Sequence, residues 1–177
     1  MLVNGKAFTS GAIPYGSTVN VTRGTLTLRT EAGTMTVWGA GVSANFVLER
    51  LTDKGRTIVQ LRLVGGDFTV CRKNSRKLSS AARAAPPKTV RRLLARRSSR
   101  SRSAELFDGS LAASQGRYRT LGRYASATDD LGAFWLTADR CDGTSAQVRQ
   151  GTVSVRDLVQ KKTVVVRAGH SYLARKP

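Results

Sequence analysis

Aromatic residues, histidine and long apolar runs are all scarce in this chain of 177 residues. Aromatics make up 6% of the sequence, and His170 is its one histidine. A core must therefore consist mainly of valine and leucine. A zinc site or a catalytic triad that depends on histidine would have one such residue available. No apolar run approaches the ~20 residues that span a bilayer as a helix. Residues 1–5 lack the basic and apolar parts of a signal peptide, so we expect a cytosolic chain or part of a longer or signal-bearing precursor.

Catalytic and phosphate-binding motifs are missing as well. No Gly-x-Ser-x-Gly elbow is present, and Gly39-Ala-Gly41 lacks the lysine and hydroxyl residue that complete a phosphate loop. The acidic residues between positions 129 and 142 do not have the spacing of a calcium loop. We therefore predict no enzyme activity, no cofactor and no metal ion, with His170 at the surface or at the end of a strand.

Cysteine is limited to two residues, Cys71 and Cys141, and each ends a segment rich in β-forming residues. They are either two buried thiols or a disulfide, and we expect the disulfide. A bridge across this loop would stabilise the fold by about 4 kcal/mol. It would also require an oxidising compartment. The expectation therefore favours an extracytoplasmic location, with the cytoplasm as the alternative if the thiols are free.

Apolar and polar residues alternate in short runs at both ends of the chain. In residues 17–22 and 25–29 valine or leucine occupies every second position, which is the period of a strand. Asp53-Lys-Gly55 and Asp142-Gly143 have the composition of hairpin turns. Such runs recur every 8 to 12 residues or so, which predicts an all-β fold of about 10–12 short strands. We expect an antiparallel sandwich or roll, or a short β-solenoid, forming one domain over residues 1–177.

The middle of the chain, residues 72–104, separates an N-terminal half (1–71) from a C-terminal half (105–177) and holds most of the charge. It contributes +12 of the net +19 and contains no acid, whereas the two halves contribute +3 and +4. Its Ser, Arg, Ala and Pro content predicts a flexible basic insert. The apolar spacing within residues 89–96 predicts one or two amphipathic helical turns. The residues expected to contact anions are Arg91, Arg92, Arg96, Arg97, Arg100 and Arg102.

Arginine and tyrosine alternate at the start of the C-terminal half, where Gly-Arg-Tyr occurs twice between residues 116 and 124. Both residue types are enriched among the residues that dominate protein–protein binding energy. We therefore predict an exposed contact strip for a partner. Its members are Arg117, Tyr118, Arg119, Arg123 and Tyr124.

Several segments along the chain combine a strand with a turn glycine. They are residues 13–19 (IPYGSTV), 24–28 (GTLTL), 61–71 (LRLVGGDFTVC), 116–128 (GRYRTLGRYASAT), 135–144 (WLTADRCDGT), 151–169 and 172–174. Their order resembles that of FecR-type domains, the all-β extracytoplasmic modules of bacterial iron-citrate sensors and related surface proteins. The C-terminal half is most similar to a subgroup of actinobacterial surface proteins. One departure is Asp129-Asp130-Leu-Gly-Ala133, where the family usually has Val-Arg-Gly-Thr.

This resemblance implies a cell-surface module that senses or relays a signal through protein contacts and catalyses no reaction. We therefore predict a non-enzymatic, FecR-like interaction or signal-sensing module whose partner is another protein. The alternative is that residues 72–103 bind nucleic acid, an anionic cell-wall polymer or an anionic membrane surface. Nucleic acid is the weaker choice, because the insert has no aromatic residue on which bases could stack.

Overall fold

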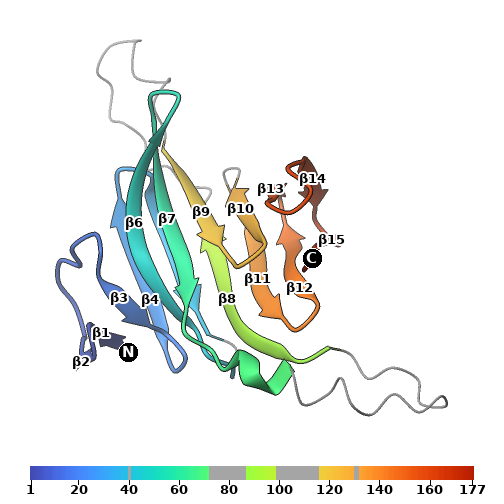
Figure 1. Cartoon of the computed structure of the whole chain (residues 1–177). Helices are drawn as coiled ribbons and strands as arrows, with labels where there is room; N and C mark the ends of the chain where they lie inside the picture. The colour runs from blue at the N-terminus through green and yellow to red at the C-terminus, as the bar shows by residue number, and fades with distance from the viewer. Residues whose placement is uncertain (40, 72–86, 99–115, 130–131) are drawn as a thin grey trace, which may run out of the picture.

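The computed structural model describes residues 1–39, 41–71, 87–98, 116–129 and 132–177. Two β-sheets pack as a sandwich (Figure 1), which confirms the all-β prediction in its sandwich form. The other regular element in the described part is η1, a short 3₁₀ turn at Phe68–Cys71. In those same ranges no helix is long and apolar enough to cross a membrane.

Nine strands form one sheet, called sheet A here, and six form the other, sheet B. Neighbouring strands are antiparallel except β7 and β9, which are parallel. In spatial order sheet A contains β14 (Thr163–Arg167), β13 (Thr152–Asp157), β10 (Ala125–Asp129), β9 (Arg117–Leu121), β7 (Arg56–Val64), β6 (Asn45–Asp53), β3 (Thr18–Asn20), β1 (Leu2–Val3) and β2 (Lys6–Ala7). Sheet B contains β15 (Ser171–Arg175), β12 (Gly143–Gln150), β11 (Phe134–Arg140), β8 (Thr89–Arg97), β5 (Gly33–Trp38) and β4 (Thr25–Thr30).

Each sheet combines strands from both ends of the chain. In sheet A, β7 of the N-terminal half pairs with β9 of the C-terminal half, with Val59 opposite Tyr118. In sheet B, β8 lies between β5 and β11. Because both sheets are completed across the halves, neither half has a full pair of sheets of its own.

The core between the sheets is aliphatic, as the low aromatic content predicts. Its largest fully buried side chains are Trp135, Tyr118 and Phe46, and the remainder is mostly valine, leucine and alanine. The alternation of residues 25–29 is confirmed in β4, where Leu26 and Leu28 face inward. Strand periodicity thus selects the residues of the core.

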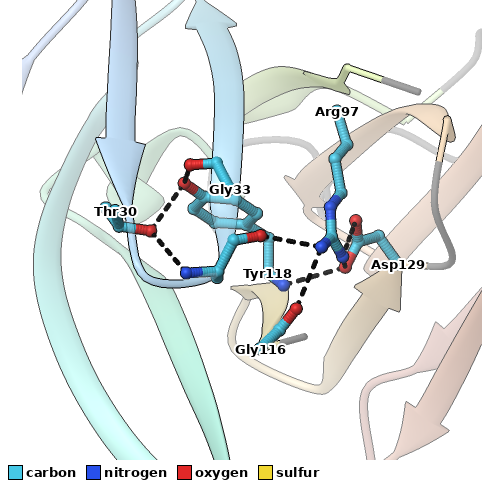
Figure 2. A network of polar contacts seen from close by, with 7 residues as sticks. Thr30, Gly33, Arg97, Gly116, Tyr118 and Asp129 are labelled. Atoms are coloured by element: carbon cyan, nitrogen blue, oxygen red, sulfur yellow. Dashed lines mark hydrogen bonds and ion pairs between the residues drawn. The ribbon is translucent and has the colours of Figure 1, made fainter. Parts of the chain in front are cut away.

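Polar side chains also connect the two sheets through the core. The indole N–H of Trp135 in sheet B donates to the hydroxyl of Thr120 in sheet A at 2.9 Å. Arg97 of β8 pairs with Asp129 of β10 at 3.1 Å, and both side chains are almost fully buried. Figure 2 shows this pair beside Tyr118. These buried groups are hydrogen-bonded, as interior polar groups must be to avoid the cost of desolvation.

The basic segment contains a central strand, which corrects the prediction made for it. Residues 89–97 are β8, so the helix expected over 89–96 is wrong, and this part of the insert is not flexible chain. Leu93, Ala95 and Arg97 alternate into the core, and β8 is hydrogen-bonded to a strand on each side. Pairing on both sides gives the backbone N–H and C=O groups of β8 hydrogen-bond partners. A one-turn helix exposed to water would leave more of these groups without a partner in the protein. The rest of the segment lies largely outside the described residues.

The predicted disulfide is present between Cys71 and Cys141, whose Cα atoms are 5.2 Å apart. It joins η1 to the start of the β11–β12 turn. The predicted turn at residues 53–55 is confirmed as well: β6 and β7 form a hairpin in which Lys54 and Gly55 have φ values of 49° and 74°. Two positive φ angles in succession are typical of the tight hairpin turn that matches strand twist.

Candidate interaction groove

The predicted Arg/Tyr strip does not form one surface. In β9 the side chains of Arg117 and Arg119 point outward from sheet A, whereas Tyr118 points into the core and is fully buried. The Tyr118 hydroxyl donates to the Gly33 carbonyl oxygen at 2.8 Å and lies 2.8 Å from the Thr30 hydroxyl. Adjacent side chains of a strand point to opposite faces, so the prediction of an exposed Tyr118 is wrong.

Arg123 and Tyr124 lie in the turn after β9, away from the outer face of the strand. The Arg123 guanidinium stacks over the rings of Phe68, at 5.1 Å, and Tyr124, at 5.5 Å. The Arg123 backbone N–H donates to Asp139 Oδ1 at 2.9 Å. These two residues therefore belong to a cluster beside η1. Apart from the buried Tyr118, the residues predicted to contact a partner thus lie in two separate places, and not on one strip.

Arg117 and Arg119 line a broad, open hollow of about 970 Å³ on the outer face of sheet A. We call it the arginine groove. Its lining comes from the β6–β7 hairpin and from the outward positions of β7, β9, β10, β13 and the segment that follows. The residues are Asp53, Lys54, Arg56, Ile58, Gln60, Arg117, Arg119, Leu121, Ser126, Thr128, Ser154, Arg156, Leu158 and Thr163.

Differences in side-chain length account for the hollow. On β10 and β13 the outward positions include Ser126, Thr128 and Ser154, which are short. Their cross-strand neighbours include Arg119, opposite Thr128, and Arg156, opposite Ser126. Long arginines beside short hydroxyl residues leave a floor of hydroxyl groups with taller cationic sides.

The charge of the groove is strongly positive. Lys54, Arg56, Arg117, Arg119 and Arg156 line it, and Asp53 is its one carboxylate. In the part of the chain that the structure describes, none of the five cations forms an ion pair. Arg119 contacts the floor, where its Nε lies 3.2 Å from the Thr128 hydroxyl. The guanidinium groups thus retain donors for a ligand.

Two of the arginines predicted to contact anions are instead occupied inside the protein. Arg97 is 4% exposed; besides Asp129 it donates to the carbonyl oxygens of Ala32 at 2.7 Å and Gly116 at 3.0 Å (Figure 2). Arg91 donates to Asp139 at 2.7 Å and to the Gly65 carbonyl oxygen at 2.8 Å. Neither guanidinium is available to an external anion, so the prediction is wrong for both.

The other arginines of that set fall in different places. Arg96 is exposed on the outer face of sheet B, and Arg92 is half-buried on the same face. Arg100 and Arg102 lie outside the described residues. On the described strand, only one fully exposed arginine of the set therefore remains.

Most of the arginine groove was missed from the sequence. Arg56, Arg156 and the hydroxyl floor come from three strands that are far apart in the chain. The alternation of alanine with Ser126 and Thr128, and of valine with Ser154 and Arg156, shows that each strand has a polar face. It does not show that these faces are neighbours, because that depends on strand order.

The acidic residues and His170, considered in the sequence for metal or triad chemistry, lie apart in the described ranges. No group of three or more His, Cys, Asp or Glu side chains there is placed to hold a metal ion. His170 is exposed just before β15, at the end-of-strand position predicted for it. Asp139 and Asp142, two of the acidic residues between positions 129 and 142, pair with Arg91 and Arg140 respectively.

Comparison of the sequence with known protein families finds no family that matches, and comparison with curated proteins finds no match either. The class of the protein is therefore defined by its fold: a disulfide-linked, two-sheet β-sandwich with a cationic groove on one outer face.

Proposed function

We propose that this chain is a non-enzymatic interaction module that works outside the cytoplasm and contacts another protein through the arginine groove. The observation that carries the proposal is the set of cations in the groove with no ion-pair partner among the described residues. The planar fork of arginine is pre-organised, so it loses less conformational freedom for each hydrogen bond it forms, and it donates in pairs to an acidic group. Display of such groups is sufficient for binding and requires no reaction.

The lining of the groove supports binding in preference to catalysis. It offers guanidinium donors, hydroxyls and aliphatic side chains, and its one carboxylate, Asp53, is exposed at the hairpin. A nucleophile with a neighbouring base that a third group orients is the arrangement expected for covalent catalysis, and the lining includes neither histidine nor cysteine. The resemblance to FecR-type domains, which act through protein contacts, supports the same interpretation.

The disulfide supports the proposed location. Cys71–Cys141 joins segments from both halves of the chain, and such bonds persist in oxidising compartments. We therefore place the module at the cell surface or in a secreted protein. A thiol titration of the native protein tests this: no reactive thiol is expected, whereas two would contradict the extracytoplasmic assignment.

The protein contact is tested by charge reversal in the groove. The double variant Arg117→Glu/Arg119→Glu, secreted in the oxidised form, should lose the chemical cross-link to its partner on cells of the source organism. The matched control is Arg29→Glu/Arg175→Glu, which makes the same charge change at exposed positions of sheet B. Equal cross-linking by both variants, with the folds intact by circular dichroism, would contradict the proposal.

The alternative, anion binding by residues 72–103, is weakened by the positions of Arg91 and Arg97. It is best tested by substitution, because deleting the segment removes β8 from the centre of sheet B. Arg92→Gln/Arg96→Gln should leave salt-dependent retention on nucleic acid or anionic polymer unchanged if the alternative is wrong. A large loss of retention would favour it over the groove.

A further inference from the structure

We propose that the ligand of the arginine groove is an extended acidic peptide segment, supplied by the partner protein, whose carboxylates alternate along one side. This inference rests on the proposed function and names the chemistry of the partner. Three features of the groove support it: the spacing of the arginines, the groups on the floor and the groups that the lining lacks.

The spacing of the arginines matches that of an extended peptide. Arg117 and Arg119 are two residues apart on β9 and face the same way, so their Cα atoms are about 7 Å apart. In an extended peptide, side chains of alternate residues are separated by the same distance of about 7 Å. Two glutamates with one residue between them can therefore each meet one guanidinium.

A third cation extends the match across the sheet. Arg156 lies on β13, and β10 separates β13 from β9, so two inter-strand spacings, about 10 Å, lie between the strands. The carboxylate side chain of another residue of the same peptide can reach Arg156. The groove thus presents guanidinium groups on two sides of the hydroxyl floor.

The floor suits a polypeptide backbone. Ser126, Thr128 and Ser154 offer hydroxyls that both donate and accept. A peptide main chain carries alternating N–H and C=O groups that need such partners when they lose water. Ile58, Leu121 and Leu158 add apolar surface for its aliphatic side chains.

The lining fits a peptide better than a uniform polyanion. It contains no aromatic side chain, so nucleic-acid bases have no platform on which to stack. Asp53 would repel one charge of a polyphosphate, whereas in a mixed peptide it can pair with a lysine or a free amino terminus. The apolar side chains of Leu121 and Leu158 would likewise form no favourable contact with a chain of phosphates.

The test is a binding titration with synthetic peptides of about eight residues, long enough to cross the groove when extended. The first alternates glutamate with alanine or serine, and the second has glutamine in place of each glutamate. The oxidised full-length chain should bind the first peptide and not the second, and its affinity should fall as salt rises. Arg117→Gln/Arg119→Gln should weaken binding by at least about tenfold, because two charge-assisted contacts are lost.

The matched control is Arg29→Gln/Arg175→Gln, at exposed positions of sheet B, which has the same net charge and should keep the affinity of the unmodified protein. Equal loss in both variants would overturn the groove as the site. Tighter binding of oligothymidylate or polyphosphate than of the glutamate peptide, with the same dependence on Arg117 and Arg119, would overturn the peptide in favour of a phosphate polymer.

A competition arm distinguishes this inference from the proposed function. The glutamate peptide should block the cross-link to the partner. A cross-link that depends on Arg119 but is not blocked by the peptide would overturn the acidic-peptide inference and leave the proposed function in place. A cross-link independent of Arg119 would overturn both.

Discussion

Two buried carboxylates in the described ranges, Asp129 and Asp139, pair with arginines. The Arg97–Asp129 pair connects the two sheets, and the Arg91–Asp139 pair joins neighbouring strands of sheet B. Asp129 accepts from Arg97 and, at 2.8 Å, from the backbone N–H of Tyr118. Asp139 accepts from Arg91, from the backbone N–H of Arg123 and from the Thr144 hydroxyl. Each carboxylate is thus surrounded by donors, and removal of one partner leaves the other charge without compensation in a low-dielectric region.

Asp129→Ala should therefore lower the free energy of unfolding by about 3–5 kcal/mol, because the Arg97 guanidinium stays buried without its carboxylate. The control is Asp142→Ala. Asp142 pairs with Arg140 at the surface, where side chains are 27% and 28% exposed, and its loss should cost less than about 1 kcal/mol. Urea unfolding of the two variants measures both values; similar costs would contradict the difference in burial.

Tyr118 provides a test at high pH. Burial raises the pKa of Tyr118 to about 12, above the value of about 10 for an exposed tyrosine. The unfolded chain therefore loses this proton first, and the stability that the neutral phenol contributes falls as pH rises from about 10 to about 12. Urea midpoints measured across this range should decline less steeply in Tyr118→Phe than in the unmodified protein. Identical slopes would show that Tyr118 does not titrate in this way.

At the scale of the element, β8 decides how sheet B is completed. It pairs with β5 on one side and β11 on the other, so Ala95 lies between Val37 and Trp135. Without β8, the remaining strands of sheet B would form two separate groups, β4–β5 and β11–β12–β15. A segment with the composition of a linker thus supplies the strand on which the sheet depends.

Ala95→Pro should abolish cooperative unfolding. Proline cannot donate to the ladder and is excluded from the middle of sheets, and Ala95 is fully buried there. The control on the same strand is Arg96→Gln, an exposed position, which should change stability by less than about 0.5 kcal/mol. Thermal unfolding followed by circular dichroism distinguishes them, and a cooperative Ala95→Pro transition near the normal midpoint would contradict the central position of β8.

At the scale of the whole molecule, the two halves of the chain are held together in three ways. β7 pairs with β9 in sheet A, β8 joins β5 to β11 in sheet B, and the disulfide joins Cys71 to Cys141. The arginine groove depends on the first of these connections, since its lining combines β7 with β9, β10 and β13. Separation of the halves would therefore divide the groove.

Cys71→Ser/Cys141→Ser should lower the free energy of unfolding by about 4 kcal/mol, because the 70-residue separation leaves a long loop unconstrained in the unfolded chain. Reduction of the unmodified protein should have the same effect. Urea unfolding with and without reductant measures it. A reductant effect that persists in the double variant would show that the loss does not come from this bond.

The strand content was predictable because its signal is local. Alternation in β4 and the turn at Lys54 and Gly55 each depend on a few adjacent residues, and the scarcity of aromatics is read from composition alone. The structure confirms what they predict. The disulfide was predictable as well, because the chain has two cysteines and therefore one intramolecular pairing. Strand period and turn chemistry are properties of adjacent residues.

The predictions that failed concern residues whose partners lie far away in the sequence. Arg91 and Arg97 look like solvated charge until Asp139 and Asp129 are placed beside them, 48 and 32 residues later. The apolar residues of 89–96 fit a helix as well as a strand, and pairing with β5 and β11 selects the strand. Tertiary contacts override such weak local preferences.

By itself the sequence determined the class of fold, the core composition and the one bond that the two cysteines can form. The order of the strands, the burial of two arginines and the arginine groove were decided only by the tertiary structure. The physical reason is that a strand specifies which of its residues share a face, whereas hydrogen bonding between distant strands specifies which faces become neighbours. Arg117, Ser126 and Arg156 line one groove because β9, β10 and β13 are adjacent in sheet A.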